Sequence, residues 1–407
     1  MRTNILYLFL FLSHCCYSQA NRNEDFVLKG IQAAQEQKYG LAISYLQFSL
    51  NDKTLSDSTK ISGEFYLQYA YHKTNNPKFS IEKLDSIVPQ YTNCKDSTAT
   101  VFIRDIAYSL SKSGYYNKAL EYGKQATKRI KELKGSQSLE YAYSLDNLAI
   151  RYKDCNVLDS ALLFVKEAGL IIEKYKGNNN IDYAKNLNII ASVYANDNKY
   201  QLAIEYTHKA VDIAKRIKDD YSCAIFLDQL GNYYWNNDEF QLGIKYIEEA
   251  LKILRNNNLV GRDYAITVSN LAQKYLYIGE FDIAIDNYVE SLEHLDDRNC
   301  LDYALILYDL SICYYFKGDY KAFCSYSDIS LSIMKDIYKC NDWHYFYYQR
   351  EIVEKILQQE DYIRAKNRIE DILENCAELP DSELVYYYKQ LSVCFSVISY
   401  DYHKSTA

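Results

Sequence analysis

Residues 262–295, RDYAITVSNLAQKYLYIGEFDIAIDNYVESLEHL, decide the fold. They predict two amphipathic helices joined by a short turn. Leu271 and Ala272 share one face of the first helix with the residues three and four positions away, and Ala284 and Tyr288 form the matching face of the second. Such a pair cannot bury both of its apolar faces alone, so it needs neighbours of the same kind.

The same pattern returns along most of the chain at a spacing of about 40 residues. A small residue marks the start of each second helix, at Ala42, Ala119, Ala161, Ala203, Gly243, Ala284 and Ala365. The matching small residue of the first helix is Gly30, Ala107, Ala149, Ala191, Gly231, Ala272 or Ser311. In one unit Phe323 replaces the small residue, and we expect the neighbouring Ala322 to take its role after a small rotation of the helix. A period of this length without a strand signal predicts an all-α solenoid of helical hairpins.

An acidic residue followed by tyrosine and alanine opens the first helix at residues 140–142, 182–184, 263–265 and 302–304. Near a helix start, a carboxylate accepts hydrogen bonds from backbone N–H groups that lack a partner, and the helix dipole stabilises its charge. We therefore expect these acidic residues to cap their own helices.

Composition agrees with a helical chain. The 407 residues include only 13 glycines and 3 prolines, so helix breakers are scarce. The net charge of −8 disfavours binding to nucleic acid or to anionic lipid. The 44 tyrosines exceed what core filling alone requires. Because tyrosine joins a large apolar face to a polar tip, it suits both helix packing and an exposed recognition surface.

The repeat pattern divides the chain into four parts. They are a signal peptide at residues 1–18, irregular repeat units at 24–95, an array of about seven units at 100–380, and a terminal helix at 381–407 that is a cap or the start of a further unit. Within the irregular part, Glu82 stands where alanine belongs, and Pro77 and Pro89 are added. We expect that unit to be degenerate.

The N-terminus predicts export. A charged residue precedes the apolar run of residues 5–12, which is too short to span a bilayer, and a polar end follows. We place cleavage after Ser18, which leaves an extracytoplasmic protein in the periplasm or outside the cell, and no later segment is apolar enough to span a membrane. Cys15 and Cys16 allow a lipoprotein anchor, an alternative that His14 before Cys15 disfavours.

The remaining cysteines are odd in number and contain no CxxC pair or metal-ligand spacing. We interpret most of them as small buried apolar residues. Cys313 and Cys324 lie on the two helices of one repeat and form the one candidate disulfide, although two reduced thiols in a core is the favoured interpretation.

The repeated helix-pair pattern resembles the tetratricopeptide repeat (TPR) family. The segments YSLDNLAIRY (143–152) and VSNLAQKYLY (268–277) are most similar to the long-period variant of kinesin light chains, as also found in exported bacterial TPR proteins. The resemblance covers residues 24–400. It implies a right-handed superhelix whose first helices line a concave groove that binds peptides or protein segments, and it implies no catalytic activity.

If that geometry holds, each first helix contributes residues to the groove. The candidates are Asn147, Asn188, Asp228, Asn232, Trp235, Asn270, Gln273, Tyr277, Asp309 and Tyr315. Their amides and carboxylates suit an extended peptide backbone, and Trp235, Tyr277 and Tyr315 suit apolar contact. The alternative is that they form only a solvated inner face. Lys185 and Arg104 are the only basic residues that we expect there, so capture of a terminal carboxylate is not expected.

Signatures of enzymes are absent from the sequence. The six histidines are far apart, and there is no phosphate-binding glycine loop, no GxSxG motif and no catalytic Cys/His arrangement. We expect no catalytic residue, no metal and no cofactor. The first hypothesis is therefore an exported adaptor that binds a protein or peptide. The second is the sensory N-terminal part of a longer signalling or effector protein, and a hydrolase is the weakest.

The terminal segment 382–400 motivates that second hypothesis. Apolar residues surround much of its helix, whereas a capping helix carries one polar face. We expect either self-association through Leu384, Val385, Leu391 and Phe395 or a continuation of the protein beyond Ala407. A slightly apolar cap is the simpler alternative.

Overall fold

A computed structural model describes residues 23–74, 76, 78–90, 97–112, 114–338, 343–375 and 379–406. Within these residues the secondary structure is helical, without strands, which confirms the all-α prediction. The signal peptide predicted at residues 1–18, with Cys15 and Cys16, lies outside the described residues.

The chain forms two compact units. The first comprises residues 1–108 and 121–136, and the second comprises residues 109–120 and 137–407. The first unit contains helical residues 23–35, α2 (Tyr39–Ser49), α3 (Asp57–Lys73) and α4 (Ile81–Ile87), and the two units share α5 (Ser97–Lys112) and α6 (Tyr116–Lys134).

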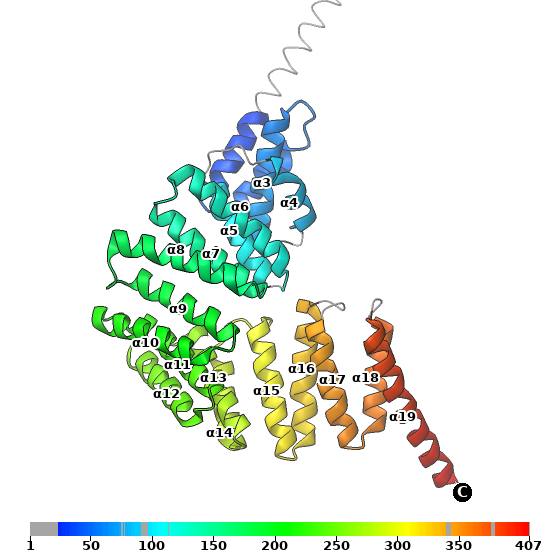
Figure 1. Cartoon of the computed structure of the whole chain (residues 1–407). Coiled ribbons are helices and arrows are strands. Elements are labelled where there is room, and N and C mark those ends of the chain that lie inside the picture. The colour runs from blue at the N-terminus through cyan, green and yellow to red at the C-terminus, as the bar shows by residue number, and fades with distance from the viewer. Residues whose placement is uncertain are drawn as a thin grey trace, which may run out of the picture. The chain divides into compact units, whose positions relative to one another are not determined.

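The second unit continues the series of helix pairs. Its helices are α7 (Leu139–Asp154), α8 (Leu158–Lys176), α9 (Ile181–Asn196), α10 (Tyr200–Ile217), α11 (Asp220–Asn236), α12 (Phe240–Asn256), α13 (Arg262–Tyr277), α14 (Phe281–Glu293), α15 (Leu301–Phe316), α16 (Tyr320–Tyr338), α17 (Trp343–Gln358), α18 (Tyr362–Asn375) and α19 (Asp381–Thr406). Each packs against the next in chain order, as Figure 1 shows for α15 to α19.

The degenerate repeat in the first unit ends in a short helix. α4 has 7 residues, where the second helices of the next repeats have up to 19. Pro89 follows soon after its last turn, and proline cannot donate the backbone hydrogen bond that a longer helix needs. An aromatic cluster still gives this unit a core, because the ring of Phe102 lies 4.8 Å from Phe65 and 4.5 Å from Tyr69.

The small residues lie where the paired helices cross. All those predicted from the repeat pattern are buried, in first and second helices alike. A close crossing joins α11 and α12, where both partners are glycines. A Cβ atom on Gly231 would lie 2.6 Å from the Gly243 carbonyl oxygen, and one on Gly243 would lie 2.9 Å from the Gly231 carbonyl oxygen. Only glycine allows the two backbones to approach this closely.

The turn between the two helices of a pair has one repeated conformation. One residue adopts a positive φ of 55° to 84°, at Gln37, Gly114, Asn156, Asn198, Asp238, Gly279, Gly318 and Glu360. The next residue then donates its N–H to the carbonyl five positions earlier, for example from Val157 to Tyr152 at 2.9 Å. This bond satisfies a carbonyl at the end of the first helix and fixes the direction of the second.

Tyrosine contributes to packing inside the repeats. In four pairs a tyrosine of the first helix stacks on an aromatic ring of the second helix, with centroids 5.2 to 5.6 Å apart. The stacked pairs are Tyr152–Phe164, Tyr194–Tyr206, Tyr234–Tyr246 and Tyr314–Tyr326. Offset stacking adds to the area that each ring buries, so many of the tyrosines serve the array itself.

The expected role of the acidic residues that open the first helices is wrong. In α7, α9 and α15 the residue before the helix supplies the cap instead, as when Asn180 accepts from the backbone N–H groups of Asp182 and Tyr183 at 3.0 Å. The carboxylates lie two positions after the capping position, and three of them, those of Asp182, Asp263 and Asp302, accept from the preceding repeat instead. Asp182 accepts from the Tyr143 hydroxyl at 2.9 Å, and Asp302 accepts from Arg262 Nε at 2.8 Å.

The position of Phe323 also differs from expectation. Phe323 itself is fully buried and Ala322 is only half-buried, so no rotation replaces one by the other. The ring of Phe323 contacts Tyr315 and Tyr320 at centroid distances of 5.3 and 5.9 Å. Cys313 and Cys324 are both free thiols in the structure.

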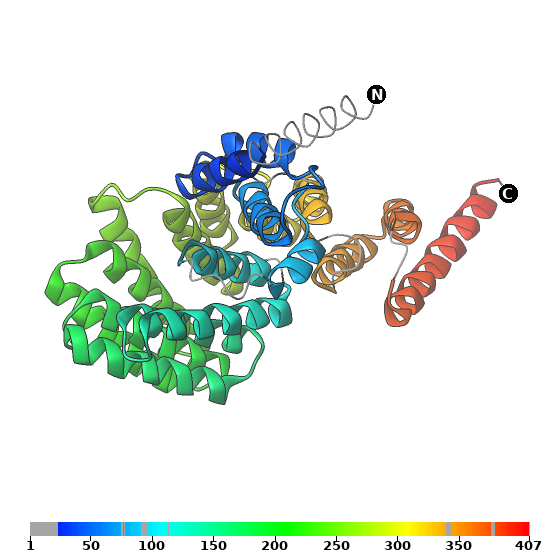
Figure 2. The same cartoon turned by 90° about the horizontal axis from the view of Figure 1, so that it is seen from above.

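The terminal helix α19 packs against α18 and extends to Thr406 (Figure 2). Of the residues predicted to mediate self-association, Leu391 packs against the core of the last repeats and Leu384 is half-buried. Val385 and Phe395 are exposed. Self-association through this helix stays a prediction.

The glycine crossing gives a first test. We expect Gly231→Ala to destabilise the chain by about 1–3 kcal/mol, because the methyl group meets backbone atoms that cannot move aside. Urea unfolding followed by circular dichroism measures this loss. Gly40→Ala on α2 is the matched control, since a Cβ atom there has no neighbour within 4 Å, and alanine stabilises a helix by up to about 1 kcal/mol. Equal effects of the two substitutions would contradict the proposed role of the crossing.

Candidate functional site

The first helices of the second unit form a continuous surface. α7, α9, α11 and α13 each contact the next first helix as well as their own partners, and α15 contacts α17 through Tyr315 and Gln358. We call this surface the first-helix face. It carries all ten residues predicted to line a groove, although the structure brings only some of them together.

Six of the ten lie on the neighbouring helices α11 and α13. Asn270 on α13 donates its Nδ2 to both carboxylate oxygens of Asp228 on α11, each at 3.0 Å. Asn232 on α11 donates to the Asp228 backbone carbonyl at 3.0 Å. The contact between Asn270 and Asp228 connects two successive repeats through polar side chains that are largely buried.

An aromatic group adjoins this polar contact. Trp235 on α11 lies 4.8 Å from the ring of Phe240 on α12 and 5.3 Å from the ring of Tyr277 on α13, measured between centroids. Tyr277 is 71% exposed, whereas Trp235 is only 8% exposed. The expectation that Trp235 is an exposed contact surface for a peptide is therefore wrong. Its indole is buried and packs against the ring of Tyr277.

Lys274 on α13 completes the group. Its side chain is buried, and its Nζ lies 5.3 Å from the Trp235 ring and 3.4 Å from Gln273 Oε1. An ammonium over an indole face is attracted by the π electrons of the ring. We define the Trp235 cluster as Asp228, Trp235, Phe240, Asn270, Lys274 and Tyr277.

Burial disfavours the charged forms of the two ionisable groups in the cluster, Asp228 and Lys274. Burial raises the pKa of Asp228 to about 6, although the hydrogen bond from Asn270 and the charge of Lys274 both lower it. Burial likewise lowers the pKa of Lys274, and the Asp228 carboxylate opposes this shift. Each group depends on the other to stay charged in a poorly solvated place.

The other four candidates lie on other helices. Asn147 on α7 is exposed and donates to the Tyr143 carbonyl at 2.9 Å, and Asn188 on α9 is half-buried. Asp309 on α15 accepts from the Tyr288 hydroxyl at 3.3 Å, and burial raises its pKa to about 7. Tyr315 donates its hydroxyl to Gln358 of α17 at 2.7 Å, so it joins two repeats.

Buried polar groups recur on this face. Asn186 on α9, which the sequence did not single out, donates to Asp146 of α7 at 2.7 Å, and burial raises the pKa of Asp146 to about 7. The pattern also missed Lys274, because a helical lysine is normally solvated. Its position two residues after the small residue of the repeat is the available signal, since Arg151 holds the same position after Ala149 and is also buried.

Among the described residues, no three His, Cys, Asp or Glu side chains lie close enough together to hold a metal ion. No helix in the described part of the chain is both long and apolar enough to cross a membrane.

The fold can now be compared with known proteins. No family model and no curated protein sequence matches this chain. A Rap protein complexed with Competence and Sporulation Factor is similar at 16% identity and a TM-score of 0.51, covering 94% of this chain and 99% of its own. Aspartyl phosphate phosphatase F from Bacillus subtilis is similar at 13% identity and a TM-score of 0.51, covering 88% and 94%.

The chain has a tetratricopeptide-like fold. TPR-like repeats of a kinesin light chain from Podosopora anserina also match, at 15% identity and a TM-score of 0.41, over 50% of this chain and 99% of theirs. The TPR-like fold predicted from the repeat pattern is confirmed by the two similarities with a TM-score of 0.51, and at these identities the similarity concerns the fold alone.

The raised pKa of Asp228 gives a second test. The unfolded carboxyl loses its proton near pH 4 and the folded one near pH 6, so Asp228 lowers the stability of the fold progressively across this range. Asp228→Asn keeps an acceptor for Asn270 and removes the charge. We expect its stability relative to the parent chain to rise by about 1–3 kcal/mol between pH 4 and pH 7.

Thermal or urea unfolding at several pH values measures this difference. The control is Asp212→Asn on α10, which removes an exposed carboxylate and leaves the first-helix face unchanged. A pH-independent difference between Asp228→Asn and the parent chain would show that Asp228 is not held as described.

Proposed function

We propose that this chain is a non-catalytic scaffold that binds an extended protein or peptide segment on its first-helix face. The contact centres on the Trp235 cluster. We also propose that the chain acts outside the cytoplasm, after removal of the signal peptide at residues 1–18.

The observation that carries this proposal is the contrast between Tyr277 and its support. Tyr277 is 71% exposed, yet its ring meets Trp235 edge-to-face at 5.3 Å and lies 6.0 Å from Phe240. An exposed aromatic ring on a rigid base loses little conformational freedom when a partner covers it. Such residues contribute disproportionately to binding at protein interfaces.

Polar groups near Tyr277 suit the backbone of an extended segment. The carboxamide of Gln273 is exposed beside the ring, one helical turn away. Peptide N–H and C=O groups supply the matching donors and acceptors. The solved complex of a Rap protein with Competence and Sporulation Factor, which has a similar fold, also supports the choice of a binding role.

Peptide selection tests the proposal directly. A random peptide library displayed on phage is panned on the purified chain, and the affinity of a selected peptide is measured by calorimetry. We expect Tyr277→Ala to weaken binding at least tenfold, a loss of about 1.4 kcal/mol. Because Tyr277 is exposed, the variant should fold normally.

Tyr175→Ala is the matched control, since Tyr175 is also a largely exposed tyrosine but lies on the second helix α8. It should leave affinity unchanged. If the selected peptides bind the Tyr277→Ala variant as tightly as the parent chain, the Trp235 cluster is not the binding surface.

Export has its own test. When the whole chain is expressed in a bacterium, mass spectrometry of the protein from the cell envelope should find Gln19 as its first residue. A lipid-modified Cys15 or Cys16 would support the anchored alternative. Recovery of the intact chain from the cytoplasm, starting at Met1, would contradict export.

A further inference from the structure

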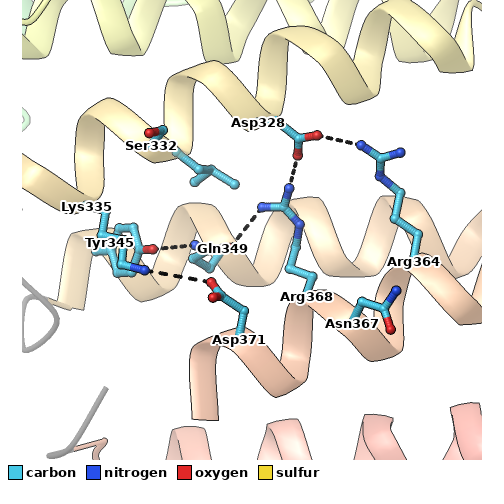
Figure 3. Close-up of a pocket in the computed structure, with 10 residues that line it drawn as sticks. Asp328, Ser332, Lys335, Tyr345, Gln349, Arg364, Asn367, Arg368 and Asp371 are labelled. Atoms are coloured by element: carbon cyan, nitrogen blue, oxygen red, sulfur yellow. Dashed lines mark hydrogen bonds and ion pairs between the residues drawn. The ribbon is translucent and has the colours of Figure 1, made fainter. Parts of the chain in front are cut away.

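A cavity of about 430 Å³ lies among the last repeats, away from the Trp235 cluster. Its lining comes from three successive helices, α16, α17 and α18 (Figure 3). A volume of this size is typical of small-molecule sites. None of the residues predicted to line a peptide groove contributes to it.

Charged side chains dominate the cavity. Figure 3 shows Asp328 of α16 between two guanidinium groups of α18, those of Arg364 and Arg368, and it pairs with both. Lys335 of α16 lies 3.8 Å from Asp371 of α18. Three cations therefore face two carboxylates, and one positive charge in the lining has no matching carboxylate.

Arg368 is the least solvated of these cations. Its side chain is 15% exposed, and burial lowers its pKa, although Asp328 opposes this. Its Nη1 donates to Gln349 Oε1 at 3.2 Å, and Gln349 in turn donates to the Tyr345 hydroxyl at 2.6 Å. This chain of contacts fixes the orientation of the guanidinium plane.

Both arginines nevertheless keep N–H donors that no protein acceptor uses. The Nε atom of Arg368 is buried and has no hydrogen-bond partner. A guanidinium has five N–H donors, and leaving one buried and unpaired is unfavourable. Arg364 uses only one of its side-chain nitrogens, in the pair with Asp328, and its side chain is 39% exposed. Two partly unused guanidinium groups thus face one accessible cavity.

The lining also has an exposed polar edge, through which a ligand can enter, and a buried apolar side. Ser332 and Asn367 are exposed and lie at the cavity's open edge, whereas Leu331 and Tyr345 are buried. A ligand can enter past the polar pair and place an apolar group against the buried pair. This combination distinguishes the cavity from a plain surface ion pair.

We propose that this cavity binds a small organic anion, a carboxylate or a phosphate monoester, through Arg368 and Arg364. The oxygen atoms accept from the unpaired Nε of Arg368 and the free N–H groups of Arg364, in the planar geometry that guanidinium groups offer to such anions. The apolar body of the ligand lies against Leu331 and Tyr345. Asp328 competes with the ligand for both guanidinium groups.

That competition separates ligand binding from a purely structural ion pair. If Asp328 only connects α16 to α18, a variant without this carboxylate is less stable and binds no anion. If the arginines form an anion site, Asp328→Asn frees both guanidinium groups and strengthens binding. The proposal does not depend on the peptide-binding role of the Trp235 cluster.

Isothermal titration of the purified whole chain tests the proposal, with benzoate, phenyl phosphate and inorganic phosphate as probes. We expect saturable binding of benzoate or phenyl phosphate, at least tenfold weaker in Arg368→Gln and several-fold tighter in Asp328→Asn. A preference for benzoate or for phenyl phosphate identifies the anionic group. Inorganic phosphate should bind more weakly than phenyl phosphate, because it lacks the apolar body.

Arg350→Gln is the matched control, because Arg350 lies on α17, pairs with Glu354 and does not line the cavity. It should leave the affinity within about twofold of the parent chain. Circular dichroism establishes that each variant is folded. Absence of saturable binding by all three probes, or weaker binding by a folded Asp328→Asn variant, would overturn the proposal.

Discussion

The close crossing of two helices within each repeat is the constraint on which the rest of the structure depends. Gly231 and Gly243 bring the backbones of α11 and α12 close together, and alanine takes the same place in most of the other repeats. Once the backbones are this close, the neighbouring positions have little freedom. The tyrosine three residues after Gly231 must then lie beside the second helix, where it stacks on Tyr246.

Steric requirements of this kind were readable from the sequence, because only a few residue types satisfy them. A position that must be small can hold glycine, alanine or serine, so the period of the array appears directly in the chain. Phe323 shows the limit of that reasoning. A large side chain occupies a position where small ones recur, and in the structure it is buried with the rings of Tyr315 and Tyr320 beside it.

Polar partners were harder to predict, since hydrogen bonds depend on orientation across repeats that are distant in sequence. Aspartate is a residue type that often caps helices, yet Asp182 accepts a hydrogen bond from Tyr143 of the preceding repeat. Lysine is normally exposed to solvent, yet Lys274 lies buried against Trp235. The periodic pattern placed Asp228, Asn270 and Tyr277 on the first helices, but it could not show that the first two pair or that Trp235 is covered.

The hydrogen bonds between successive repeats have a consequence for how such a chain can lengthen. Near its start, one first helix donates through Tyr143, Tyr221 or Arg262 to the acidic residue near the start of the next first helix. The repeat that begins with α13 carries both halves of such a junction, because Arg262 donates to the unit that follows it and Asp263 accepts from the unit before it. Copying this repeat in tandem would supply the donor and the acceptor of the new junction at once.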